Sequence, residues 1–174
     1  FPQRIFGGVA EYYNNPERCS VDTFAYFHYG KKFDHNWKDS GDWELTPTTA
    51  ENLLDLEALY HNRSGGLMLE GMDLTPQQPA EQELQESYQQ AGLQRQRSLF
   101  ALKREGTMIA LFMALRTTAG ANLSNLTDAI TVLILDPEAL QREAYFTAIY
   151  MLSSKYPHAE VPVLTYPAAY TEEQ

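Results

Sequence analysis

The chain contains a single cysteine, Cys19, among its 174 residues. One cysteine cannot form an internal disulfide, and it has no second cysteine at the spacing of a zinc site or a redox motif. We therefore expect a protein of a reducing compartment, with the cytoplasm as its location. The chain begins at Phe1 rather than with methionine, and no basic segment followed by an apolar one opens it. This beginning predicts a piece of a longer protein.

Basic residues are also few. There are 13 Lys and Arg residues against 23 Asp and Glu residues, so the formal net charge is −10. A chain of this charge repels nucleic acid and anionic membrane surfaces unless its cations cluster, and we expect neither partner. No apolar run approaches the roughly 18 to 20 residues that a membrane-spanning helix needs.

Several catalytic signatures are missing. The four histidines never fall three or four residues apart, which is the spacing at which one helix presents two metal ligands. The Gly-x-Ser-x-Gly elbow of serine hydrolases does not occur. A glycine-rich phosphate loop with Gly-Lys-Ser does not occur either. The sequence therefore predicts no metal site, no serine hydrolase and no nucleotide-binding P-loop.

What the chain does have is apolar and aromatic residues in quantity. Its hydrophobic share is 44%, with 8 Phe, 11 Tyr and 2 Trp residues, which is enough to build a core. Residues 93–118 form the one basic stretch, with a net charge of +4. This stretch is either the place to look for an anionic ligand or a set of outward-facing residues on half-exposed strands.

The pattern along the chain predicts two regions. Residues 1–46 are rich in aromatics and are expected to form a strand and loop segment that packs on a main domain of residues 47–174. A helix is expected to begin near Ala50, after Thr46-Pro47, and to end at Gly65-Gly66. A second helix carries Leu84 and Tyr88 and ends at Gly92.

The rest of the chain alternates strands with one helix. Strands are expected, in order, over residues 23–29, 98–103, 107–117, 130–135 and 161–166. Arg104-Glu105-Gly106 has the length of a hairpin connection. Asp136-Pro137-Glu138 is expected to open a helix that runs to about Tyr156. The last two strands are then joined by a helix and should be parallel neighbours, so the fold class is α+β with a mixed sheet.

This order of elements resembles the GNAT superfamily of acyl-CoA N-acyltransferases, over about residues 50–166. The polar stretch Asn122-Leu-Ser-Asn-Leu-Thr-Asp128 is similar to a loop of such domains in large bacterial multidomain proteins. The resemblance implies a fold with an antiparallel hairpin followed by a parallel strand-helix-strand unit. It implies acyl transfer from a thioester carrier, acyl-CoA or another pantetheine carrier, to an amine. The partners it implies are other domains of the parent chain and a small-molecule or acyl-carrier ligand.

The resemblance also implies site residues. The pantetheine arm would lie between the strands at 130–135 and 161–166, with its pyrophosphate at the start of the following helix. The residues implied for the cofactor are Leu133, Leu135, Gln141 and Arg142. Those implied for catalysis are Glu70, Asp73 and Tyr166. A ligand loop would use Asn122, Ser124, Asn125 and Asp128, whose side chains are equally suited to local turns of the backbone.

The helix start departs from the family pattern. GNAT proteins carry small residues there that let the backbone wrap the pyrophosphate. This chain has no glycine at Asp136-Pro137-Glu138 and places two carboxylates where the phosphates would lie. Arg142 would offset part of this charge or pair with Glu138 four residues away. A non-catalytic binding or regulatory module that retains the fold is therefore the alternative.

Overall fold

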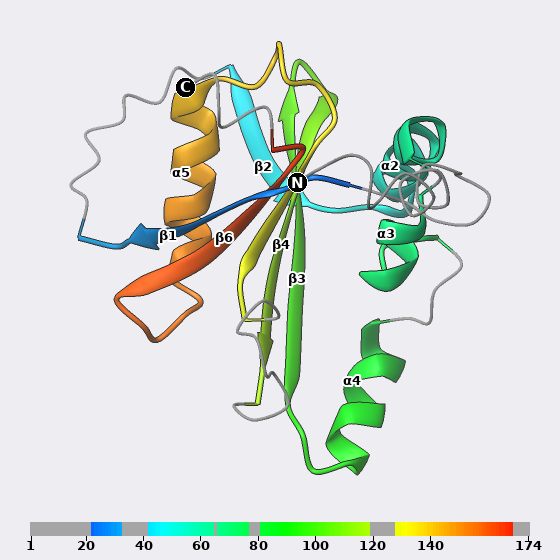
Figure 1. Cartoon of the computed structure of the whole chain (residues 1–174), viewed down its shortest axis with the longest axis vertical. Coiled ribbons are helices and arrows are strands. Elements are labelled where there is room, and N and C mark those ends of the chain that lie inside the picture. The colour runs from blue at the N-terminus through cyan, green and yellow to red at the C-terminus, as the bar shows by residue number, and fades with distance from the viewer. Residues whose placement is uncertain (1–21, 33–41, 65, 77–80, 119–127, 169–174) are drawn as a thin grey trace, which may run out of the picture. The chain divides into compact units, whose positions relative to one another are not determined.

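The computed structural model describes residues 22–32, 42–64, 66–76, 81–118 and 128–168, which form a mixed α+β fold (Figure 1). Six strands build one sheet in the order β1-β6-β5-β4-β3-β2. β5 and β6 are parallel, and the other neighbouring pairs are antiparallel. The strands are β1 (Ala25–Gly30), β2 (Trp43–Pro47), β3 (Arg95–Arg104), β4 (Thr107–Thr117), β5 (Ile130–Ile134) and β6 (Glu160–Tyr166). The expected α+β class with a mixed sheet is confirmed.

The β3–β4 hairpin lies in the middle of the chain and supplies the fourth and fifth strands of the sheet, between β5 and β2. Both central residues of its turn have positive φ, 51° at Glu105 and 81° at Gly106, as the tightest hairpin turns require. Seven consecutive residues of β4, Met108 to Ala114, are buried. The predicted hairpin and the prediction of a central strand covered on both faces are therefore confirmed.

The parallel pair follows the hairpin. β5 runs antiparallel to β4, from Ala110 opposite Ile134 to Ala114 opposite Ile130. Helix α5 (Arg142–Ser153) then carries the chain back, and β6 pairs with β5 in parallel. The expectation that residues 130–135 and 161–166 are parallel neighbours is confirmed.

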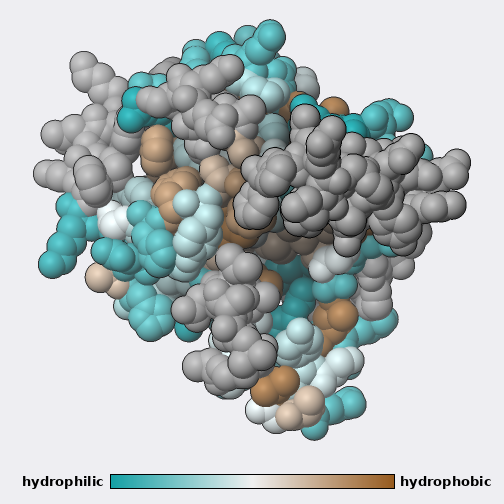
Figure 2. Space-filling view, in the orientation of Figure 1, coloured by the Kyte–Doolittle hydropathy of each residue, from teal (hydrophilic) through white to brown (hydrophobic). Residues whose placement is uncertain are grey.

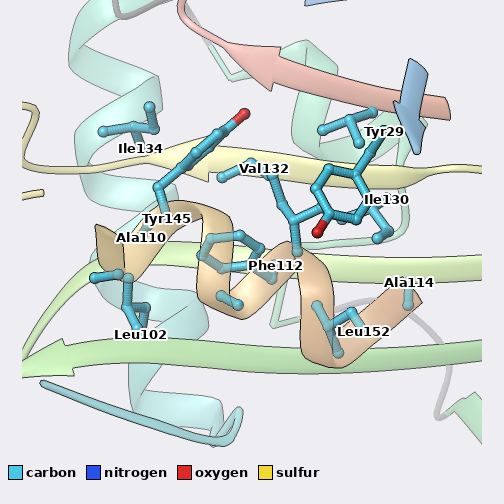
Figure 3. Close-up of a cluster of buried hydrophobic side chains, with 14 of the residues drawn as sticks. Tyr29, Leu102, Ala110, Phe112, Ala114, Ile130, Val132, Ile134, Tyr145 and Leu152 are labelled. Carbon is cyan, nitrogen blue, oxygen red and sulfur yellow. The ribbon is translucent and has the colours of Figure 1, made fainter. Parts of the chain in front are cut away.

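α5 covers one face of the sheet (Figures 1 and 3). Alternate strand residues point toward it, among them Phe112 and Val132, and they form a core with Ala148 and Leu152 of the helix. Their neighbours along the strands, such as Leu111 and Leu133, therefore point to the opposite face. Both of these leucines are also fully buried.

The predicted start of α5 is wrong. The helix begins at Arg142, after an extended N-cap residue Gln141 with ψ 143°, instead of at Asp136-Pro137-Glu138. Asp136 caps a separate turn, because its Oδ1 accepts the backbone N–H groups of Glu138 and Ala139 at 3.1 and 3.0 Å. Leu140 follows that turn and is buried in the core, so the chain is extended at Gln141 before the helix starts.

The N-terminal segment supplies the two outermost strands of the described sheet, β1 beside β6 and β2 beside β3. β1 fits the strand expected over residues 23–29, whereas β2 extends to Pro47, where a helix start was expected. The helix itself, α2 (Ala50–Ser64), begins three residues later. Thr49 and Asn52 cap it, since the Thr49 N–H donates to Asn52 Oδ1 at 3.2 Å.

The chain divides into two compact units. The first consists of Phe1–Thr23 and Thr49–Gln78, and the second of Phe24–Thr48 and Pro79–Gln174. The first unit holds α2 and the short helix α3 (Leu67–Gly71), with Leu56, Tyr60 and Leu69 buried. The second holds the whole sheet, α5 and α4 (Glu81–Gln90). α4 is the predicted second helix, and it ends before Gly92, which has φ 73°.

Candidate functional site

The candidate site of the second unit is the C-terminal end of the parallel pair β5–β6. Leu133 lies between Leu111 of β4 and Tyr166 of β6 in the register of the sheet. β5 and β6 stay paired up to Tyr166, the last residue of β6. The N–H groups of Leu135 and Asp136 both donate to the carbonyl of Ile109, at 2.9 and 3.1 Å. The backbone at this end of the sheet is thus largely engaged within the protein.

The start of α5 lies just beyond this end. Gln141 makes no side-chain hydrogen bond to the first turn of the helix, which leaves that turn without a side-chain cap. The Arg142 guanidinium lies 5.8 Å from the centroid of the Phe146 ring. No ion pair in the described part of the chain joins Arg142 to Glu138, so the aromatic ring takes the place of that carboxylate.

On the α5 face, a buried pair of hydroxyls ties β6 to the helix. Tyr145 and Thr165 form a hydrogen bond, and both side chains are buried. Figure 3 shows Tyr145 among the apolar side chains of β4 and β5, including Phe112 and Val132. Neither hydroxyl was singled out in the sequence, because a helix tyrosine in an apolar stripe has the pattern of an ordinary core residue.

Tyr166, the last residue of β6, lies on the opposite face of the sheet. Its side chain is 7% exposed. The ring of Phe24 lies 5.3 Å from the Tyr166 ring, centroid to centroid, with an interplanar angle of 39°. The phenol predicted as a candidate acid therefore lies beneath an aromatic side chain from the N-terminal segment, a contact that no sequence pattern indicated.

Glu70 and Asp73 belong to the first unit. Glu70 is the fourth residue of α3 and is exposed. Asp73 lies in the turn that follows, with φ 54°, and its N–H donates to the Glu70 carbonyl at 3.1 Å. The two carboxylates are thus neighbours in one turn, whereas Tyr166 and the residues implied for the cofactor belong to the second unit.

Of the predicted ligand loop, only Asp128 is among the described residues. Asn122, Ser124 and Asn125 lie outside them. One carboxylate oxygen of Asp128, Oδ1, is buried without a hydrogen-bond partner. Next to this carboxylate, the Tyr156 hydroxyl donates to the carbonyls of Ala129 and Leu115, at 2.7 and 3.1 Å.

The Tyr156 phenol thus joins the end of β4 to the start of β5. Burial raises the pKa of Tyr156 above its ordinary value, and the negative charge of Asp128 raises it further. A phenol with a raised pKa stays protonated and keeps both hydrogen bonds. Tyr156 is therefore a structural residue at the base of the loop and was missed in the sequence, where it marked only the expected end of a helix.

The basic stretch is divided between the two ends of β3 and β4. Arg95, at one end, is buried and its guanidinium lies 5.7 Å from the centroid of the Tyr88 ring of α4. Lys103 and Arg104 lie at the other end, about nine residues or 30 Å along the strand. The cations therefore do not form one patch, and Arg95, being buried, is not one of the outward-facing residues that the second interpretation expected. Figure 2 shows hydrophobic residues in separate groups on the surface in view.

Among the described residues, no group of three or more His, Cys, Asp and Glu side chains is arranged to hold a metal ion. No described helix is long and apolar enough to cross a membrane. A scan of family models and searches of curated proteins and of solved structures found no match to this chain.

Proposed function

We propose that this chain is a GNAT-like acyltransferase-fold domain that binds the pantetheine arm of an acyl carrier at the C-terminal end of β5 and β6. The observation that carries the proposal is the order and pairing of the elements. Helices precede an antiparallel hairpin, β5 follows beside it, and α5 leads to a strand parallel to β5. This is the arrangement on which the resemblance rests, and fold alone leaves the chemistry open.

In this proposal the reaction is the transfer of an acyl group from a thioester to an amine. Leu133 and Leu135 contact the pantetheine arm, and Gln141 and Arg142 contact the phosphates. Tyr166 protonates the departing thiolate. The carboxylates that the resemblance implies as bases, Glu70 and Asp73, belong to the first unit. Asp128, with its buried unpaired oxygen, is the described part of the ligand loop.

The observed start of α5 supports a phosphate-binding role more than the sequence did. The carboxylate of Asp136 accepts two N–H groups of its own turn, and Glu138 precedes the helix by four residues. The first turn of α5 instead holds Arg142 and Glu143, whose charges offset each other. The attraction for a phosphate there therefore comes from the backbone N–H groups of the turn, which has no side-chain cap, and from the positive end of the helix dipole.

A specific observation favours the alternative, a non-catalytic binding or regulatory module. β5 and β6 are paired as far as Leu133 and Tyr166, and Phe24 covers the Tyr166 ring. A pantetheine arm needs free backbone groups between the two strands, and a general acid needs contact with the leaving group. In the alternative, the fold is kept for binding other domains of the parent chain.

Two assays separate these functions. Calorimetry with acetyl-coenzyme A at low ionic strength measures carrier binding, and release of free thiol in the presence of primary amines such as spermidine and lysine measures transfer. Saturable binding with amine-dependent thiol release, lost in Tyr166→Phe, is the result expected of an acyltransferase. Binding without thiol release favours the non-catalytic module, and absence of binding at millimolar carrier contradicts the carrier site.

A further inference from the structure

A row of residues leads from the edge of the sheet to the candidate site. β1 and β6 pair antiparallel with Ala25 opposite Thr165, so Phe24, one residue earlier, comes opposite Tyr166, one residue later. Tyr166 is in turn opposite Leu133. Because directly opposite residues point to the same face of a sheet, Phe24, Tyr166 and Leu133 form one row.

Burial increases inward along this row. Phe24 is 43% exposed, Tyr166 is 7% exposed and Leu133 is fully buried. Phe24 is therefore the outermost member of the row and the one whose side chain can leave its place at the smallest loss of buried apolar surface. Its ring rests on the ring of Tyr166 at 5.3 Å, a distance at which aromatic pairs attract each other.

Phe24 and its partner come from segments far apart in the sequence. Phe24 directly precedes β1, in the aromatic-rich N-terminal segment, and Tyr166 ends β6. Phe24 lies outside residues 50–166, the stretch that resembles an acyltransferase, and Tyr166 lies inside it. Their contact therefore joins the N-terminal segment to that stretch.

We propose that Phe24 controls access to Tyr166, and that the size of the side chain at position 24 determines which acyl carriers and amines reach the end of β6. The inference rests on the proposed function for the identity of these ligands. The cover itself is a property of the contact between the two rings and is tested without any ligand.

The test compares Phe24→Ala with Tyr26→Ala. Tyr26 is the matched control, because it lies two residues further along the chain, on the same face of the sheet, and is equally exposed, at 44%. Its ring contacts His28. Phe24→Leu is a third variant that keeps an apolar side chain over Tyr166. Acetylation of tyrosines by N-acetylimidazole, mapped by peptide mass spectrometry, reports the accessibility of Tyr166 in the whole chain.

We expect the acetylation rate of Tyr166 to rise about tenfold in Phe24→Ala, which corresponds to about 1.4 kcal/mol, and to stay near the native rate in the other two variants. An unchanged rate in Phe24→Ala, or an equal rise in Tyr26→Ala, overturns the proposal. A rise at the core residue Tyr145 as well would show general opening of the fold and would also overturn it.

Titration of the same variants with coenzyme A tests the ligand separately. A higher affinity in Phe24→Ala than in the native protein and in Tyr26→Ala supports control of carrier access. If Tyr166 becomes accessible and no variant binds coenzyme A, the proposed carrier site fails while the cover stands. If coenzyme A binds equally to all variants, Phe24 does not control access and the inference fails while the carrier site stands.

Discussion

The Tyr156 hydroxyl bridges the end of β4 and the start of β5. Its removal should therefore lower the stability of the protein. Tyr156→Phe removes the donor to the carbonyls of Leu115 and Ala129 and keeps the buried ring. We expect a loss of about 1 to 3 kcal/mol in the free energy of unfolding, because the buried hydrogen bonds of the hydroxyl are lost, although the Ala129 carbonyl keeps the Leu115 N–H at 3.2 Å. Denaturation in urea measures it.

Tyr88→Phe is the control for this substitution. It removes a phenol oxygen and keeps the ring against which Arg95 packs, so we expect a change within about 0.5 kcal/mol. Equal stabilities of Tyr156→Phe and the native protein would contradict the structural role of the Tyr156 hydroxyl.

Leu111 and Leu133 are directly opposite each other in adjacent strands, and both are fully buried. Substituting either with alanine should cost roughly 2 to 5 kcal/mol, because a cavity remains where the side chain was. Met151→Ala, at a half-exposed position of α5, should cost much less. A loss under about 1 kcal/mol at both leucines, measured by chemical denaturation, would show that this part of the sheet is not central.

The burial of Tyr29 should make the stability of the protein depend on alkaline pH. Burial raises the pKa of its phenol to about 12, with the nearby Tyr150 phenol contributing, whereas an unfolded tyrosine titrates near 10. The folded state therefore favours the neutral phenol, so its contribution to stability is complete below about pH 10 and is lost as the pH rises toward 12. Stability measured between pH 9 and 12 should fall less steeply in Tyr29→Phe, and identical slopes would contradict this assignment.

At the scale of the elements, local signals were sufficient wherever one segment decides its own structure. The apolar run of β4 and the glycine after Arg104 and Glu105 predicted the β3–β4 hairpin, and Gly92 predicted the end of α4. The start of α5 was mispredicted because Asp136 and Pro137 do form a capped turn, but the burial of Leu140 separates that turn from the helix. Tertiary packing decided that boundary, and no local pattern carries it.

The candidate site was predictable only in part for the same reason. The sequence predicted that Leu133 and Tyr166 belong to neighbouring parallel strands, and the register places them opposite each other. Phe24 lies more than 140 residues from Tyr166 in the chain, so their contact depends on the pairing of β1 with β6. That pairing was not predictable, since an edge strand from a distant segment has no local signal for its partner.

The β3–β4 turn holds two residues at positive φ, which makes its sequence important for stability. Glu105 adopts φ 51°, which is unfavourable for a residue other than glycine or asparagine. Glu105→Asn should therefore stabilise the protein by a few tenths to about 1 kcal/mol, and Gly106→Ala, at φ 81°, should destabilise it by about 1 kcal/mol. Thermal unfolding of both variants measures the pair. A destabilising Glu105→Asn together with a stabilising Gly106→Ala would contradict the turn geometry.

At the scale of the whole molecule, one region of the mixed sheet, the C-terminal end of β5 and β6, is the proposed binding site for an acyl carrier. The two candidate functions share this sheet and differ in whether that end accepts a ligand. The chain carries a net charge of −10, which works against a polyphosphate ligand at long range. In the proposed function, binding of coenzyme A therefore depends on local contacts at the α5 start and is best measured at low ionic strength.

Amide chemical-shift mapping with coenzyme A tests the central claim most directly, because it reports binding and its location together. Pantetheine without the nucleotide is the matched ligand, and it should perturb the strand residues without those at the helix start. We predict saturable shifts at Leu133, Leu135, Gln141, Arg142 and Tyr166 with coenzyme A. Absence of shifts at these residues at millimolar coenzyme A, or shifts confined to other elements, would contradict the proposed carrier site.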